Sequence, residues 1–380
     1  MTIQNQIERA RKAFEQISDY TQEQVDKLVY EGAKIIYENA KPLAKMAVEE
    51  TRLGDYESKI GKNEGTAAAF WDYLKDKKSV GIINEDPSIG LIEAAHPIGV
   101  IGCITPATNP TVTPLGNFMH AVKCKNAVII SPAPRAEKTS TETVNLIRKA
   151  LAANGAPEDL IQIVNDVTIE KSQELMANCD LVIATGGAGL TKAAYSSGTP
   201  AYGVGPGNPP VVIDRGYDLK DAAEQSIVAI ASDNGILCDG DNLLLYPEDV
   251  EAEFFEEMRK AGAVIFDDAA DVAKFRDALF QDGKVNPGLV GKDTDVIAEA
   301  AGYNIPEGTK VIGLKVEGVG KDDILGKEIM GPVVVLKSYD KFEDAVDMAI
   351  RNMEEDGGTG HTEYSRTTKI TSFTSERRFL

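Results

Sequence analysis

The residues best suited to chemistry lie in one short stretch, Ser232-Asp-Asn-Gly-Ile-Leu-Cys-Asp239. Asp-Asn-Gly favours a sharp turn, because glycine adopts positive φ and the Asx side chains bond their own backbone. Ile236 and Leu237 predict an apolar wall beside the Cys238 thiol. A thiolate attacks carbonyl carbons readily once its pKa is lowered. An isolated cysteine is more often a buried core residue, so the rest of the sequence has to decide between the two interpretations.

Three further polar residues are candidates for a catalytic or binding role. Asn109 lies in a stiff turn between two prolines, where its amide could donate to an oxyanion, although an isolated Asn-Pro usually starts a helix. Glu328 precedes an apolar strand and could bond a ribose diol or be solvated. His361 is a loop residue that could act as acid or base near neutral pH, or be a polar turn residue. His96 and His120 show no partner and are expected to be structural.

Two glycine-rich stretches could bring backbone close to a ligand. Thr185-Gly186-Gly187-Ala-Gly189 lies at an expected strand-to-helix turn, where a pyrophosphate could meet the helix N-terminus. It is not the GxGxxG pattern, and glycine is common at such turns. The second stretch, Gly203-Val-Gly205-Pro-Gly207, is equally compatible with a close backbone approach and with a plain connection between strands.

Alternating strands and helices predict an α/β fold with a mostly parallel sheet. Short apolar runs predict strands at 98–104, 126–131, 160–164, 181–184 and 211–213, the last closing the series, with helices between them. Ligands of such sheets bind at the carboxyl ends of the strands. We therefore expect Thr105–Asn109, Ser131–Arg135 and Thr185–Gly187 to lie on one rim.

Other elements flank this sheet. Helices over 4–17, 22–49 and 64–76 are expected to serve as packing elements. A second α/β unit is expected beyond about 218, with strands near 243–246, 263–266, 310–314 and 332–337 and with helices over 219–231, 248–261, 270–280 and 341–353. The predicted domains are a cofactor domain (1–217), a thiol domain (218–362) and an atypical tail (363–380).

Composition restricts the class of partner. A net charge of −20 argues against nucleic acid or anionic lipid, both of which need a basic face. No apolar run reaches the length of a membrane span, and the N-terminus lacks the apolar core of a signal peptide. The four widely spaced cysteines indicate reduced thiols in a cytoplasm, and three histidines make a metal site unexpected.

Several motifs in order carry a family resemblance. They are His96–Pro110 (HPIGVIGCITPATNP), Ser131–Ala136 (SPAPRA), Ala184–Gly187 (ATGG), Ala194–Asn208 (AYSSGTPAYGVGPGN), Asp233–Cys238 (DNGILC), Glu328–Pro332 (EIMGP) and Gly360–Thr362 (GHT). The ordered set resembles the aldehyde dehydrogenase superfamily, and within it the CoA-acylating branch, nearest to the succinate-semialdehyde (acetylating) type. The fold it implies is a Rossmann-like cofactor domain plus a second α/β catalytic domain.

The resemblance implies a role for each motif. Cys238 is the nucleophile and Asn109 an oxyanion donor. The cofactor, NAD or NADP, is bound by residues of the rim and by one acid, namely Thr105, Ser131, Pro132, Arg135, Thr185, Gly186, Gly187, Gly205 and Glu328. An aldehyde and CoA are the substrates, with succinate semialdehyde as the first choice and sulfoacetaldehyde or acetaldehyde as alternatives.

One absence favours the acylating branch. Hydrolytic relatives carry a glutamate base in the stretch that matches 203–207, and this chain has no carboxylate there. Without a base to activate water, a thioester on Cys238 survives until CoA arrives. Two other functions remain possible for the chain. One is an acyl-phosphate reductase of the glutamate-5-semialdehyde dehydrogenase type, and the other is an inactive nucleotide-binding fragment.

The sequence departs from the family pattern in two places. After Cys238 the chain reads Asp239-Gly-Asp241-Asn, and nearby carboxylates raise a thiol pKa. Residues 363–380 do not match the family's continuation, which forms an oligomerising arm. We therefore expect a truncated C-terminus, which puts the family's homo-oligomer in question for this chain.

Overall fold

Two α/β units make up the part of the chain that the structure, a computed structural model, describes: residues 1–355 and 364–366. The first unit is Met1–Gly205 and the second begins at Pro206. The division therefore falls earlier in the chain than the predicted domain boundary. The assignment of cofactor binding to the first unit and thiol chemistry to the second stays a prediction.

The first unit is built on a five-stranded parallel sheet. Its strands are β3 (Val100–Thr105), β4 (Ala127–Pro132), β5 (Ile161–Ile163), β6 (Leu181–Thr185) and β7 (Ala201–Val204), in the order β5-β4-β3-β6-β7. Every residue of β3 and β4 is buried, as their continuous apolar runs predict. The strand order reverses between β3 and β6, and sheets of this class bind ligands outside the carboxyl ends of the strands at such a point. The short strand β7 was not predicted.

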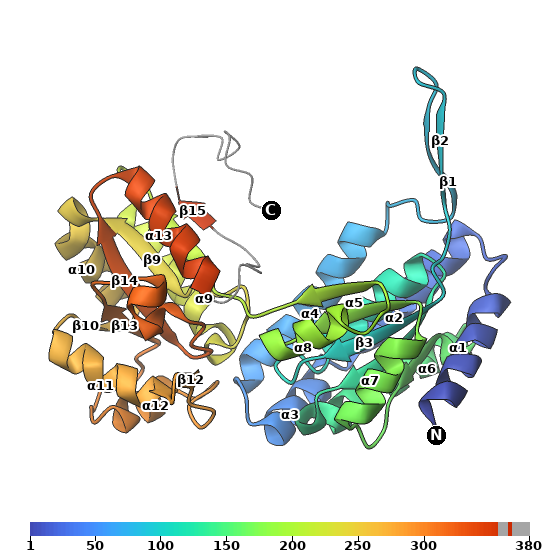
Figure 1. Cartoon of the computed structure of the whole chain (residues 1–380), viewed down its shortest axis with the longest axis horizontal. Helices are drawn as coiled ribbons and strands as arrows, with labels where there is room; N and C mark the ends of the chain where they lie inside the picture. Colours follow the sequence, from blue (N-terminus) through green and yellow to red (C-terminus); the bar gives the residue numbers. More distant parts are fainter. Residues whose placement is uncertain (356–363, 367–380) are drawn as a thin grey trace. The chain divides into compact units, whose positions relative to one another are not determined.

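Helices cover both faces of this sheet, as Figure 1 shows. They are α1 (Ile3–Gln16), α2 (Gln22–Glu38), α3 (Ala40–Thr51), α4 (Tyr56–Leu74), α5 (Val112–Lys123), α6 (Glu137–Ala153), α7 (Ile169–Asn178) and α8 (Ala188–Tyr195). Thr21 and Gln24 form the predicted capping box of α2. The single helix predicted over 22–49 is wrong, because Asn39 leaves helical geometry at φ −107° and ψ 18° and starts α3. Helix α4 begins at Tyr56, a full two turns before the predicted start.

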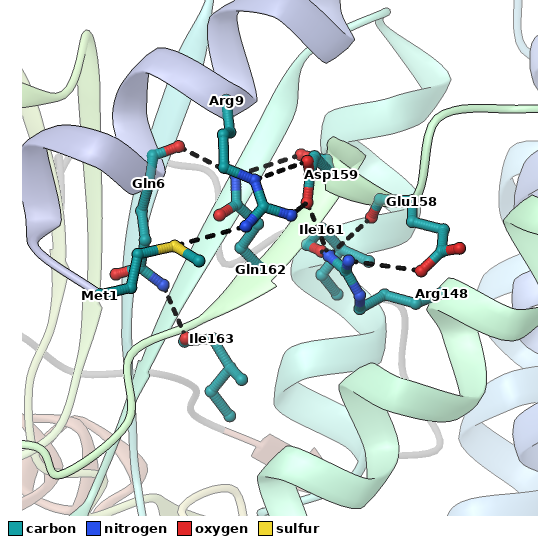
Figure 2. A network of polar contacts seen from close by, with 9 residues as sticks. All are labelled: Met1, Gln6, Arg9, Arg148, Glu158, Asp159, Ile161, Gln162 and Ile163. Carbon is teal, nitrogen blue, oxygen red and sulfur yellow. Dashed lines mark hydrogen bonds and ion pairs between the residues drawn. The ribbon is translucent and has the colours of Figure 1, made fainter.

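Helix α1 is tied to the strand β5 region by the polar network in Figure 2. Arg9 donates to both carboxylate oxygens of Asp159, at 2.9 and 2.8 Å, and Arg148 of α6 reaches the same carboxylate at 3.0 Å. Gln6 donates to the carbonyl of Ile163 at 2.7 Å. The network joins α1, α6 and β5 around one carboxylate.

An antiparallel hairpin projects from the first unit between α4 and β3 (Figure 1). It consists of β1 (Gly81–Asp86) and β2 (Leu91–Ala95), whose residues are exposed or half-buried. The sequence analysis missed it, because neither strand buries a face and neither therefore shows alternating apolar residues.

The second unit holds a six-stranded parallel sheet among its described residues. The strands are β8 (Pro210–Ile213), β9 (Leu243–Pro247), β10 (Ala263–Phe266), β13 (Val311–Lys315), β14 (Val333–Tyr339) and β15 (Tyr364–Arg366), in the order β10-β13-β14-β9-β8-β15. The expectation that 211–213 closes the first sheet was wrong, since Val211 pairs with Leu244 of β9. An apolar triplet fits any buried strand, and its sequence does not name the partner.

Alternate residues of the second sheet face two separate helical layers. Leu244 and Tyr246 pack with α9 (Leu219–Ala231) and α10 (Glu251–Ala261). Leu243 and Leu245 pack with α11 (Ala269–Leu279), α12 (Thr294–Ala300) and α13 (Phe342–Glu355). The α/β prediction for this unit is confirmed. A small hairpin, β11 (Phe280–Gln281) with β12 (Lys284–Val285), follows α11.

No helix within the described residues combines the length and the apolar character needed to cross a bilayer.

Candidate active site

The thiol loop, residues 232–242, leaves helix α9 through an unusual turn. Asp233, Asn234 and Gly235 have φ values of 51°, 52° and 66°, three consecutive residues in the left-handed region. For the two non-glycine residues this conformation costs about 1 kcal/mol each. The Asn234 side chain donates to Asp293 Oδ1 at 2.7 Å, which fixes the turn. The predicted Asp-Asn-Gly turn is therefore present, and it delivers Ile236 into the core at 2% exposure.

Backbone packing holds this loop in place. A Cβ on Gly207 would lie 1.8 Å from the carbonyl oxygen of Cys238, and one on Gly235 would lie 2.1 Å from the carbonyl oxygen of Gly331. Only glycine permits these approaches. Of the two interpretations of the second glycine-rich stretch, the close backbone approach is the one present, and the sequence did not indicate its partner, the Cys238 backbone.

Glu328 also contacts Gly207. Its Oε1 accepts a long hydrogen bond from the Gly207 N–H at 3.4 Å, and Asn242 of the thiol loop donates to the Gly207 carbonyl at 3.4 Å. Asn208 donates to the Gly326 carbonyl, two residues before Glu328. The structure therefore brings together Cys238, the glycine stretch and Glu328, which are far apart in sequence.

The cysteines differ in their accessibility. Cys103 and Cys179 are buried, and burial raises the pKa of the Cys103 thiol well above its ordinary value. Cys238 is only half-buried and reachable from outside. Among these three, Cys238 is the one placed to meet a substrate.

The carboxylates that follow Cys238 border an open cavity of about 610 Å³ beside α9. Asp241 is 4% exposed and lies 3.4 Å from the Arg366 guanidinium. Burial raises the pKa of Asp241, although the Arg366 charge opposes the shift. Asp241 is thus paired with Arg366.

In the first unit, the predicted rim residues lie at the carboxyl edge of the sheet. Thr105 pairs with Pro132 across β3 and β4, and Thr185 pairs with Val204 across β6 and β7. Gly205 follows β7 directly. The carboxyl ends of β3, β4, β6 and β7 therefore lie along one edge of the sheet.

Two features of this edge could meet a phosphate-bearing ligand. Thr105 Oγ1 is buried and has no hydrogen-bond partner among the described residues. Gly187 is the N-cap of α8, and a Cβ there would meet no described atom within 4 Å. Ser131 Oγ lies 2.9 Å from Ser172 Oγ, and Arg135 is exposed, with Nη2 donating to the Thr51 carbonyl at 2.5 Å. An unpartnered hydroxyl and an open helix N-terminus suit a phosphate-bearing cofactor.

Asn109 lies just beyond β3 and is held by a residue that the sequence analysis did not single out. Its Oδ1 accepts from Lys62 Nζ of α4 at 2.8 Å, and its Nδ2 lies 3.4 Å from Thr108 Oγ1. Lys59, one turn earlier and only 2% exposed, has its Nζ 3.4 Å from the Thr108 carbonyl. Helix α4 is therefore more than the packing element that was predicted.

Glu50 is a second residue that the sequence did not indicate. Its carboxylate accepts from the backbone N–H groups of Lys138 and Thr139, each at 2.8 Å, and from Thr139 Oγ1 at 2.6 Å. The acid thus caps α6 beside the end of β4, although it comes from α3.

The histidines are placed as follows. His361 lies outside the described residues. His120 Nδ1 lies 2.8 Å from the Gly116 carbonyl of its own helix, and His96 is exposed.

A family profile described as the aldehyde dehydrogenase family matches residues 1–277. The chain belongs to the aldehyde dehydrogenase family. Over 362 residues it is 47% identical to a succinate-semialdehyde dehydrogenase (acetylating) of Clostridium kluyveri, covering 95% of this chain and 80% of that protein. A sulfoacetaldehyde dehydrogenase (acylating) of Bilophila wadsworthia is 39% identical over 360 residues, with 90% and 75% covered.

Solved structures agree with this assignment. An acetylating aldehyde dehydrogenase from Geobacillus thermoglucosidasius matches with a TM-score of 0.91 and 35% identity, covering 96% of this chain and 81% of that one. A propionaldehyde dehydrogenase of Rhodopseudomonas palustris with bound propionyl-CoA matches with a TM-score of 0.86 and 29% identity, covering 97% and 81%. The resemblance to CoA-acylating aldehyde dehydrogenases and the family's α/β fold are confirmed, and the chain is an oxidoreductase of this family.

Proposed function

We propose that this aldehyde dehydrogenase oxidises a short-chain aldehyde to an acyl-CoA with NAD(P)+, through a thioester on Cys238. The observation that carries the proposal is the half-buried thiol on a loop packed against Gly207, with Glu328 bonded to the same glycine. The stretch 203–207 carries no carboxylate that could activate water. This absence favours a thiol over water as the acyl acceptor, and the proposed reaction is reversible.

The chain's own groups account for the protein part of the chemistry. The Cys238 sulfur forms a bond to the aldehyde carbon, and the carbonyl electron pair moves to oxygen. The family resemblance implies that the amide of Asn109 and the Cys238 N–H are the donors to that oxyanion. Bound NAD(P)+ would supply the hydride acceptor, and loss of the hydride leaves the acyl group as a thioester on Cys238. The CoA thiolate then takes the acyl group and Cys238 leaves as a thiolate.

Succinate semialdehyde is the substrate we favour. The support is the 47% identity to the Clostridium kluyveri enzyme, against 39% to the sulfoacetaldehyde enzyme of Bilophila wadsworthia. Sulfoacetaldehyde and acetaldehyde are the alternatives.

The test is an absorbance assay of NADH and NADPH formation with each of these three aldehydes, with CoA, with inorganic phosphate or with neither. We expect CoA-dependent turnover, fastest with succinate semialdehyde, and its loss to background in Cys238→Ala. The matched control is Cys124→Ala, which removes an exposed thiol on the first unit and should leave the rate unchanged. Turnover with phosphate in place of CoA points to an acyl-phosphate reductase. Cofactor binding without any turnover points to an inactive nucleotide-binding protein.

For the cofactor, we infer a preference for NAD+ over NADP+. The end of the second strand of a βαβ unit, here β4, is where folds of this class meet the adenosine ribose. Glu50 places a carboxylate at the start of α6, the helix that follows β4, where it accepts from the N–H groups of Lys138 and Thr139. The negative charge of Glu50 would repel the 2′-phosphate of NADP+. The N–H groups that could bind this phosphate already donate to Glu50.

The ratio of kcat/KM for NAD+ to that for NADP+ tests the preference. We expect Glu50→Gln, which keeps one acceptor oxygen and removes the charge, to lower this ratio about tenfold by improving NADP+. Glu49→Gln, one residue earlier and exposed, is the control and should leave it unchanged. A wild-type preference for NADP+ would contradict the inference.

A further inference from the structure

We propose that Lys62 is a positioning residue for catalysis, which fixes the orientation of the Asn109 amide so that its NH2 group is available to the oxyanion. The inference rests on the proposed function, because it takes Asn109 as the oxyanion donor. The observation behind it is independent of any relative: Lys62 Nζ lies 2.8 Å from Asn109 Oδ1.

The problem that Lys62 solves is the symmetry of the amide. The two ends of an asparagine side chain have nearly the same shape, but one end only donates and the other only accepts. An amide rotated by half a turn about its last bond would present oxygen to a developing oxyanion. That arrangement repels the negative charge that it has to stabilise.

An ammonium group removes the ambiguity. Lysine has three N–H donors and no acceptor, so only the oxygen end of Asn109 can face Nζ favourably. The reversed amide would set donor against donor. The contact is also charge-assisted, and a cation on the oxygen polarises the amide, so that its N–H groups become better donors.

The backbone around Asn109 is fixed at the same time, so that a defined orientation is also a defined position. Lys59 Nζ contacts the Thr108 carbonyl at 3.4 Å, and lies on the same face of α4 as Lys62 because the two are three residues apart. Ser140 Oγ of α6 donates to the Pro110 carbonyl at 3.1 Å, and the Asn109 carbonyl accepts from the Thr113 N–H at 3.3 Å. Loop and amide are thus held by groups of three helices, α4, α5 and α6.

The first turns of α4 bring Lys59 and Lys62 to this loop. Asp55 caps the helix by accepting from the Ser58 N–H at 2.8 Å, which sets the first turn. The next turn then carries Lys59 inward and Lys62 to the edge, where it is half-buried.

The first arm of the experiment detects the contact between Lys62 and Asn109 by NMR, without an activity assay. In protein labelled with 15N-asparagine, the side-chain amide resonances of Asn109 are identified by their loss in Asn109→Ala. We expect Lys62→Met to shift these resonances clearly and Lys75→Met to leave them in place. Lys75 is a matched control at the end of the same helix, exposed and bonded to Asp72 at 2.8 Å. Unshifted resonances in Lys62→Met overturn the inference.

The second arm separates positioning from structure. We expect Lys62→Met to lower kcat about tenfold with little change in the KM for the aldehyde, and Lys62→Arg, which is also a donor-only cation, to recover most of the loss. In the Asn109→Ala background, Lys62→Met should cost less than about twofold more, because its target is gone. Full additivity with Asn109→Ala, or a normal rate in Lys62→Met, overturns the proposal.

The two levels of inference fail in different ways. If the wild-type chain shows no CoA-dependent turnover, the proposed function is wrong and the catalytic role of Lys62 falls with it, while the resonance shift still reports the contact. If the wild-type chain is active and Asn109→Ala is as fast, Asn109 is not the oxyanion donor. If only Asn109→Ala is slow, the proposed function stands and the Lys62 inference is wrong.

Discussion

The two halves of the candidate machinery are held by different means. In the second unit, the closest approaches of the thiol loop are backbone against backbone, with Gly207 on Cys238 and Gly235 on Gly331, and side-chain bonds such as Asn234 to Asp293 add to them. In the first unit, the rim is fixed by long side chains that reach the loops from helices, such as Lys62 on Asn109 and Glu50 on the start of α6. Two backbones in direct contact cannot accept an added side chain without moving apart, whereas a side-chain contact can be weakened without moving the backbone. Substitutions should therefore act abruptly in the second unit and gradually in the first.

Gly207→Ala should produce the largest effect. Its methyl group would have to occupy the position of the Cys238 carbonyl, so the thiol loop must move. We expect the free energy of unfolding to fall by about 3 kcal/mol and acyl-CoA formation to fall more than about 100-fold. Chemical denaturation and the NADH assay measure the two effects.

The control for this substitution is Gly65→Ala on α4, where an added Cβ meets no described atom within 4 Å. It should be neutral, or stabilise the exposed helix by up to about 1 kcal/mol. A Gly207→Ala enzyme with normal activity would show that the loop adapts, and the contrast between the units would then be lost.

Glu328 tests whether the second unit also contains a graded contact. Glu328→Gln keeps an oxygen for the Gly207 N–H but removes the charge, while Glu328→Ala removes both. If the acid bonds the nicotinamide ribose as the family resemblance implies, we expect the KM for NAD(P)+ to rise about tenfold in Glu328→Gln and further in Glu328→Ala. The free energy of unfolding should change by less than about 1 kcal/mol in Glu328→Gln.

Steady-state kinetics at varied NAD(P)+ concentrations measures the KM for the cofactor in each variant. Asn242→Ala, which removes the other side-chain contact to Gly207, serves as the comparison because it should affect stability more than the KM. An unchanged KM in both Glu328 variants would leave the acid a purely structural partner of Gly207.

The sequence predicted the parts of the site whose signal is local. The Asp-Asn-Gly turn, the apolar runs of β3 and β4 and the glycines after β6 each follow from neighbouring residues. Lys62 and Glu50 could not be found in this way, because a lysine or glutamate on an amphipathic helix gives the same pattern whether it binds a distant loop or water. The role of Gly207 was missed for a related reason, since its neighbour, the Cys238 carbonyl, lies thirty-one residues away along the chain.

Strand partners show the same limit. Val211 and its neighbours read correctly as a buried strand, but the choice between two sheets depends on which helices cover it, and this is a tertiary property. The hairpin β1–β2 gave no signal, because its burial pattern lacks the alternation that identifies a half-buried strand.

The smallest effect is expected at the polar network around Asp159, which contains no candidate site residue among those drawn in Figure 2. Partial burial alone would raise the pKa of Asp159, but the hydrogen bonds from Arg9 and Arg148 outweigh it and hold the pKa below its ordinary value. Because the folded-state pKa is lowered, the stabilisation is complete above the unfolded-state pKa of about 4 and is lost as the pH falls through the folded-state pKa. We expect Asp159→Asn to lower the free energy of unfolding by about 1 kcal/mol at neutral pH.

Denaturant unfolding of the wild type and Asp159→Asn at neutral pH and at about pH 3 checks the sign. The difference between them should shrink in acid, because the wild-type carboxyl is then increasingly protonated and its ion pairs weaken. Turnover at neutral pH should be unchanged, since the network touches none of the rim loops. A difference that stays constant or grows in acid would mean that Asp159 contributes through packing and not through charge. The first unit would then share the packing-based rigidity of the second, and the contrast between the two would rest on Lys62 and Glu50 alone.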